Sequence, residues 1–131
     1  MLIAKRVLLK DVDEAKKFIS SKEALLIPSE YVDSLFYVKH AYYQAKKAFD
    51  RGNNIAKNLK YEFLLRLLGE TQVKDALDII EKNTDDFVFI CWTGGIYPQF
   101  KKHFVKKELK LREHPKDLEK IQRAALLSFL R

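Results

Sequence analysis

Cysteine is almost absent from this 131-residue chain, and long apolar runs are missing altogether. The single cysteine, Cys91, cannot form an internal disulfide, which is typical of a protein kept in a reducing cytoplasm. No apolar run approaches the ~20 residues that a membrane span needs, and the first residues lack the ordered regions of a secretory signal. We therefore expect a soluble, cytoplasmic protein that has no membrane partner.

Motifs for catalysis, metals and cofactors are also missing. The sequence contains no phosphate-binding glycine loop, no G-x-S-x-G motif and no dinucleotide fingerprint, and the glycine pair at 94–95 indicates only a turn. His40, His103 and His114 lie in unrelated contexts without the spacing of metal ligands. Cys91 lies in the apolar run FVFICW, where a thiol is more often buried and inert than nucleophilic. We predict a protein that is not an enzyme and needs neither metal nor cofactor; the alternative is a small enzyme that uses Cys91 or His40.

Negative charge is scarce toward the end of the chain. The net charge is +7, and residues 1–95 hold 15 Lys and Arg against 14 Asp and Glu, whereas residues 96–131 hold 10 against 4. This asymmetry favours an anionic partner at that end, although a solvated lysine-rich surface would give the same count. Aromatic residues, namely Tyr61, Tyr97 and Phe100, are interleaved with the lysines, a pattern that single-strand binders use for base stacking. Nucleic-acid binding is therefore the favoured class.

Hydrophobic periodicity divides the chain into strands and helices. Apolar and β-branched runs predict strands at residues 2–9, 24–28 and 87–92, and the last is internal because it has no polar alternation. The remaining patterns predict helices at 12–20 and 29–51, a helical hairpin around Gly69, mixed structure at 96–111 and a final helix from Pro115 to Leu130. We expect one α+β domain over residues 1–131, with a small sheet packed against several helices.

The helical hairpin is the stretch around which the chain is organised. Asn58 can cap its first helix, and Gly69 can end that helix in the left-handed conformation. Thr71 can cap the second helix. The apolar stripe of the first helix consists of Leu59, Phe63, Leu64, Leu67 and Leu68, and that of the second of Val73, Ala76, Leu77 and Ile80.

The hairpin resembles the signature of the kinase-binding subunit of the KEOPS complex, the family of PRPK-binding protein. The matching residues are Asn54-Ile55-Ala56, Leu59, Glu62 with Leu64-Leu65, Gly69, Gln72-Val73 and Ala76-Leu77. The chain departs from the family after Leu77, where Asp78-Ile79-Ile80-Glu81 replaces a glycine turn. This departure predicts a second helix that runs on past Leu77.

The resemblance implies a non-catalytic role in modification of tRNA to threonylcarbamoyladenosine. In that family the subunit binds the kinase-like ATPase subunit of KEOPS, helps recruit tRNA through its single-stranded 3′ CCA end, and leaves the chemistry to other subunits. A stand-alone basic RNA-binding module without a kinase partner is the alternative.

Two sets of residues are candidates for these contacts. Lys57, Lys60 and Lys74 lie on the polar side of the hairpin and are predicted to contact tRNA phosphates, with Tyr61 stacking on a base. Glu62, in the first turn, is predicted to favour the helix dipole rather than to act in catalysis. The final helix has more than one apolar face, so Leu126, Leu127 and Leu130 are predicted to bind the kinase-like partner.

Overall fold

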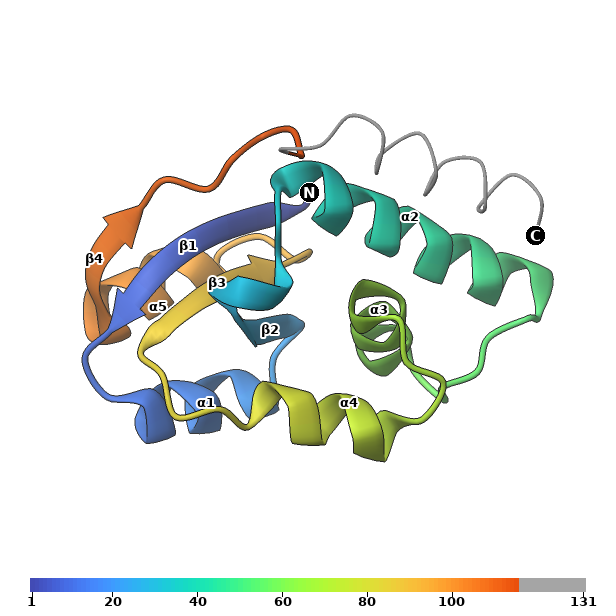
Figure 1. The fold of residues 1–131 in the computed structure, drawn as a ribbon, viewed down its shortest axis with the longest axis horizontal. Coiled ribbons are helices and arrows are strands. Elements are labelled where there is room, and N and C mark those ends of the chain that lie inside the picture. The colour runs from blue at the N-terminus through green and yellow to red at the C-terminus, as the bar shows by residue number, and fades with distance from the viewer. Residues whose placement is uncertain (116–131) are drawn as a thin grey trace.

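The computed structural model describes residues 1–115 (Figure 1). The predicted final helix, with Leu126, Leu127 and Leu130, lies outside the described residues apart from its first position. The elements in chain order are β1 (Ile3–Leu9), α1 (Val12–Ser20), β2 (Ala24–Pro28), the 3₁₀ turn η1 (Ser29–Tyr31), α2 (Leu35–Arg51), α3 (Leu59–Leu68), α4 (Val73–Ile80), β3 (Asp86–Cys91), α5 (Ile96–Phe104) and β4 (Val105–Leu109).

The strands form one four-stranded sheet in the order β2-β3-β1-β4, and every neighbouring pair is antiparallel. Internal β3 is buried from Phe87 through Cys91, as its unbroken apolar run predicts. The segment at 96–111 is mixed, as expected, because α5 leads directly into the edge strand β4. The predicted α+β fold with a small sheet and several helices is confirmed.

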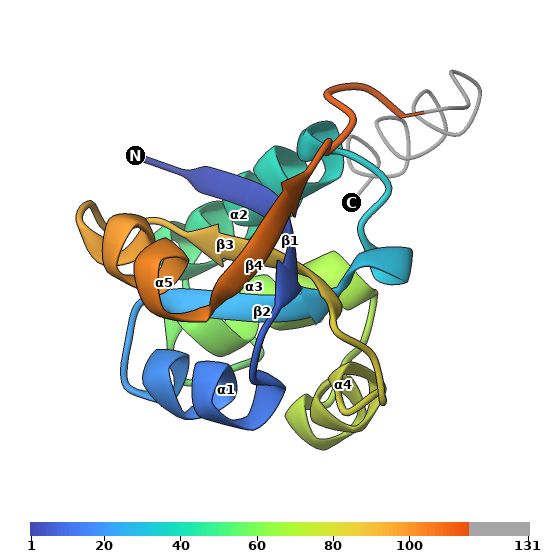
Figure 2. The ribbon, with the colours of Figure 1, turned by 90° about the vertical axis from the view of Figure 1, so that its left-hand side faces the viewer.

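The sheet separates two apolar clusters. Val88 and Ile90 of β3 point into the first cluster, with buried residues of α2 and α3, and Phe87 and Phe89 point into the second, with buried residues of α1 and α5. The alternation follows from the period of two along a strand. Helices thus cover both faces of the sheet (Figures 1 and 2).

Side chains or glycine end helices at three places, and those at Asn58 and Gly69 confirm the predicted caps. The Asp11 carboxylate accepts a hydrogen bond from the N–H of Glu14 at 3.2 Å, and the Asn58 side chain accepts one from the N–H of Tyr61 at 3.0 Å. Gly69 takes φ +70° at the end of α3, a conformation that glycine adopts without strain. The hairpin around Gly69 was therefore predictable from its sequence.

Three predictions about the helices of the first face are wrong. α2 begins at Leu35 rather than Ser29, because residues after Pro28 form η1 and Val32 then turns extended. Thr71 does not cap α4, whose N-cap residue is Gln72 without a side-chain bond. Leu77 is 39% exposed, so it lies off the packed stripe of α4. The expected continuation of α4 past Leu77 is confirmed, since the helix ends at Ile80.

No helix in residues 1–115 is both long enough and apolar enough to cross a membrane.

Candidate functional site

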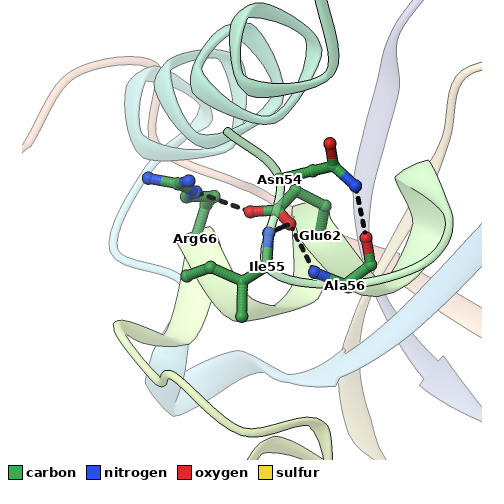
Figure 3. A network of polar contacts seen from close by, with 5 residues as sticks. All are labelled: Asn54, Ile55, Ala56, Glu62 and Arg66. Atoms are coloured by element: carbon green, nitrogen blue, oxygen red, sulfur yellow. Dashed lines mark hydrogen bonds and ion pairs between the residues drawn. The ribbon is translucent and has the colours of Figure 1, made fainter. Parts of the chain in front are cut away.

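A buried glutamate holds the segment before α3, which we call the 54–58 loop (Asn54–Asn58). The Glu62 side chain is 0% exposed, and its Oε1 atom accepts hydrogen bonds from the N–H of Ile55 at 2.6 Å and of Ala56 at 2.8 Å (Figure 3). The Asn54 amide donates to the Ala56 carbonyl at 2.9 Å and closes the loop on itself. These contacts fix the loop relative to α3.

The second oxygen of Glu62 faces a cation. Oε2 accepts from Nε of Arg66 at 2.9 Å, one helical turn farther along α3. A buried carboxylate is tolerated only when such partners replace water, and here two backbone donors and one guanidinium do so. Glu62 does lie in the first turn of α3, as predicted, but its carboxylate binds the preceding loop directly. Its role is to position the loop.

The 54–58 loop presents Ile55 and Lys57 to solvent. Ile55 is 55% exposed although it is large and apolar, whereas Ala56 beside it is buried in the first cluster. A single exposed isoleucine is ordinary on a protein surface, so Ile55 bears on function only together with the groups beside it.

A cleft of about 280 Å³ adjoins this loop, between the C-terminal halves of α2 and α3. Three cations line it, Lys47, Arg51 and Arg66, together with the exposed Ile55. Tyr43 also lines it, is 62% exposed, and has the Lys47 ammonium 5.6 Å from its ring centroid. The cleft therefore brings an exposed tyrosine beside Lys47 and Arg51, while Glu70 also lines it and Arg66 is paired with Glu62.

The four predicted tRNA-binding residues do not converge on one spot. Lys57 and Lys74 are exposed, but they lie beyond opposite ends of α3, a helix about 15 Å long. Tyr61 is half-buried and packs against the first cluster. Of these, only Lys57 belongs to the 54–58 loop beside the cleft.

Lys60 is held by another helix. Its ammonium donates to the carbonyls of Ile19 at 2.9 Å, Ser20 at 3.3 Å and Lys22 at 3.1 Å, and thereby satisfies acceptors at the end of α1. Burial lowers the pKa of Lys60, with the charge of Glu23 opposing that effect. The structure thus shows Lys60 joining α3 to α1, and phosphate binding by Lys60 stays a prediction.

Sequence reasoning missed the α2 side of the cleft. Tyr43, Lys47 and Arg51 are spaced four apart and therefore share one side of α2, a signal present in the sequence. The same helix carries a longer apolar stripe, whose periodicity is the stronger signal in the sequence.

Two other expectations concern aromatic and sulfur groups. Tyr97 is 8% exposed and Phe100 is 0% exposed, so the idea that they stack on bases is wrong. Cys91 is buried, and burial raises the pKa of its thiol, which fits the inert thiol that its surroundings predict. Within residues 1–115 no cluster of three His, Cys, Asp or Glu side chains could hold a metal ion.

The comparisons with known proteins add one relative. The chain is 41% identical over 71 residues to a protein of Pyrococcus abyssi (strain GE5 / Orsay) described as KEOPS complex subunit Cgi121. The match covers 54% of this chain and 41% of that protein, so the chain spans about two fifths of the relative's length. No protein-family model matches the chain. What the comparison establishes is similarity between part of this chain and part of a KEOPS subunit.

Proposed function

We propose that this chain is the non-catalytic KEOPS subunit that binds the kinase-like ATPase and recruits tRNA through its 3′ CCA end. The observation that carries the proposal is the Glu62 network, because it joins signature residues that lie apart in the sequence. Asn54, Ile55, Ala56 and Glu62 form one hydrogen-bonded unit. The similarity to KEOPS complex subunit Cgi121 supports the same role.

The 3′ end of the RNA binds at the 54–58 loop and the adjoining cleft. A single-stranded end exposes base faces and phosphates together, so its site needs an accessible ring beside cations. Tyr43 supplies such a ring, and Lys47 and Arg51 supply charge on the same helix. Ile55 adds an exposed apolar contact, and Lys57 adds a cation from the loop.

Rigidity makes this surface selective. Cations on a mobile tail bind any polyanion, whereas the Glu62 network holds the loop backbone in a single arrangement. Less conformational freedom is then lost on binding, which raises affinity for an end of matching shape. Lys60 stabilises the same hairpin through its bonds to α1, and Tyr61 does so by packing against the first cluster. Lys74 is an exposed cation on α4, after Gly69.

The kinase-like partner is proposed to bind the segment predicted as a helix from Pro115 to Leu130, through Leu126, Leu127 and Leu130. The proposal rests on the sequence pattern of that segment and on the family resemblance. Co-purification of a kinase-like protein from a native lysate separates this adaptor role from a stand-alone RNA-binding module.

The test of RNA recruitment compares full-length tRNA with tRNA trimmed of its CCA, at fixed salt. Stacking is worth about 1–3 kcal/mol per base, so trimming should weaken binding at least several-fold. Phosphate contacts alone would make binding depend on salt and not on the end of the RNA. Equal affinity for both RNAs would contradict the proposal.

A further inference from the structure

A second basic surface lies outside the site described above. Its exposed cations come from the last turn of α5, from β4 and from the residues after it. This α5–β4 basic surface consists of Lys101, Lys102, Lys106, Lys107, Lys110 and Arg112. Residues 96–115 contain only two acidic residues, Glu108 and Glu113. An open hollow of about 630 Å³ lies among the lysines of α5 and β4.

The acidic residue among these cations, Glu108, already has two partners within the protein. Glu108 accepts a hydrogen bond from the Tyr97 hydroxyl and lies 3.3 Å from the Lys101 ammonium. The Tyr97 hydrogen bond, followed by Lys101, lowers the pKa of Glu108, so this carboxylate stays ionised and neutralises Lys101. In the described part of the chain, no carboxylate pairs with Lys102, Lys106 or Lys107.

The tyrosine and phenylalanine side chains of this segment point inward. Phe100 lies on Phe89 with ring centroids 4.4 Å apart, and Tyr97 packs in the same buried cluster. Phe104 packs against Phe18 at 5.2 Å. The tyrosine and phenylalanine rings are therefore packed inward, and the exposed rings of residues 96–115 are those of His103 and His114.

The backbone that carries these cations is held by β1 and by Lys10, which follows β1. β4 pairs with β1, and the Lys10 N–H donates to the Phe104 carbonyl at 2.9 Å between α5 and β4. In Figure 1 α5 and β4 lie at one end of the long axis and the connection from α2 to α3 lies at the other, and in Figure 2 α5 and β4 face the viewer. One short single strand cannot contact both ends.

Lysines also protect edge strands from pairing with other chains, and β4 is an edge strand. That role accounts for Lys106 and Lys107. It does not account for Lys102, which lies on α5, or for Lys110 and Arg112, which follow the strand. Lys102 lines the same hollow as Lys106 and Lys107, whereas Lys110 and Arg112 line a neighbouring hollow with Glu30 and Asp33.

We propose that the α5–β4 basic surface binds the phosphate backbone of double-helical RNA without reading its bases. A duplex hides its base faces and presents phosphates at fixed spacing, so it suits fixed lysines whose neighbouring tyrosine and phenylalanine rings are packed inward. The inference rests on the proposed function in one respect, which is that RNA is the polyanion bound. The 54–58 loop would then hold a single-stranded end while this surface contacts a helical region of the same molecule.

The test uses the triple variant Lys102→Gln/Lys106→Gln/Lys107→Gln. Its matched control is Lys17→Gln/Lys39→Gln/Lys46→Gln, which removes the same charge from exposed positions on α1 and α2. The probes are a blunt-ended RNA hairpin and an unstructured single strand with the same number of phosphates. Binding is measured by anisotropy over a range of salt, and circular dichroism checks the fold.

The triple variant should lose about tenfold or more in affinity for the hairpin near 0.1 M salt, and its salt slope should fall by about 2 to 3. The control should change hairpin affinity less than about twofold. Hairpin binding that is the same in both variants would overturn the inference, as would a loss of affinity in the triple variant that is equal for the hairpin and the single strand. A loss confined to capture of the kinase-like partner would assign the surface to a protein instead.

The two proposals fail separately. The ratio of affinities for full-length and CCA-trimmed tRNA should be the same in the triple variant as in the unmodified protein. A ratio near one in every protein would contradict the 3′-end site and leave the duplex surface standing.

Discussion

Both ends of the molecule carry exposed cations, but they differ in where their tyrosine and phenylalanine rings lie. At the 54–58 end Tyr43 is 62% exposed beside Lys47 and Arg51, whereas at the α5–β4 end Phe100 is wholly buried. The presence of cations alone does not distinguish the two surfaces. The exposed tyrosine distinguishes a site that offers a large stacking ring from one that offers mainly cations.

The ends also differ in how their backbones are held. Main-chain pairing fixes β4 against β1, but the 54–58 loop has no strand partner and depends on a side chain. One carboxylate accepts from two N–H groups of the loop. A single substitution of Glu62 should therefore disturb the backbone of the 54–58 end far more than a single substitution disturbs that of β4.

Substitution of Glu62 by Ala should be the most damaging change. It leaves the partly buried N–H of Ile55 and the buried N–H of Ala56 without their acceptor and removes the partner of Arg66. We expect the free energy of unfolding to fall by about 3 kcal/mol, measured by urea denaturation. The matched control, Glu81→Ala at an exposed position, should change it by less than about 0.5 kcal/mol.

Glu62→Gln keeps the shape of the side chain and sharpens the test. Its carbonyl oxygen can still accept from the loop, so we expect a smaller loss of stability than with Ala. If Glu62→Ala proved as stable as the control, the loop would not depend on this carboxylate.

Tyr43→Ala should separate the two ends in RNA binding. Loss of one stacking ring should weaken binding of tRNA with an intact CCA by about 1–3 kcal/mol and leave CCA-trimmed tRNA unaffected. Tyr43→Phe retains the ring and should bind as the unmodified protein does. An equal loss with both RNAs would mean that Tyr43 contributes to a general surface and not to recognition of the end.

Lys60→Met should produce a modest change in stability. The three carbonyls at the end of α1 lose a cationic donor, but water can reach part of that site, so we expect a loss of about 0.5–1 kcal/mol. Lys57→Met is the control, since Lys57 is exposed on the neighbouring loop. A loss of tRNA affinity with unchanged stability would instead support the sequence-based role of Lys60 as a phosphate contact.

The smallest effect should come from pH at Asp86, the first residue of β3. The Arg6 guanidinium donates to both Asp86 oxygens, at 3.0 and 2.6 Å, and this hydrogen bonding lowers the pKa of Asp86. A lowered folded-state pKa gives stability that is present above the unfolded-state value and is lost as pH falls through the folded-state value. The difference in unfolding free energy between the unmodified protein and Arg6→Gln should therefore shrink on acidification; a constant difference would contradict the pairing.

The sequence predicted those features whose causes lie within a few residues. Asn58 caps α3 and Gly69 ends it because capping chemistry is local. The internal position of β3 followed from an unbroken apolar run. The strand–helix mixture at 96–111 followed from two overlapping periodicities, which became α5 and β4.

Long-range contacts decided what the sequence could not show. Lys60 looked like a free cation on a polar face, yet its ammonium reaches carbonyls 38 to 41 residues away in the chain. Tyr97 and Phe100 lie among lysines in the sequence, but a spacing of three also suits a helix that buries one side. Only packing against β3 distinguishes a stacking ring from a core ring.

The central claim, that a single-stranded 3′ end binds at the 54–58 end of the molecule, can be tested most directly by mapping that end chemically. Mild periodate oxidation converts the terminal ribose of tRNA to a dialdehyde, which forms an imine with a nearby lysine amine and is trapped by reduction with cyanoborohydride. Peptide mapping by mass spectrometry then identifies the lysine. We predict an adduct on Lys57 or Lys47 beside the cleft; an adduct on Lys102, Lys106 or Lys107 would contradict the account.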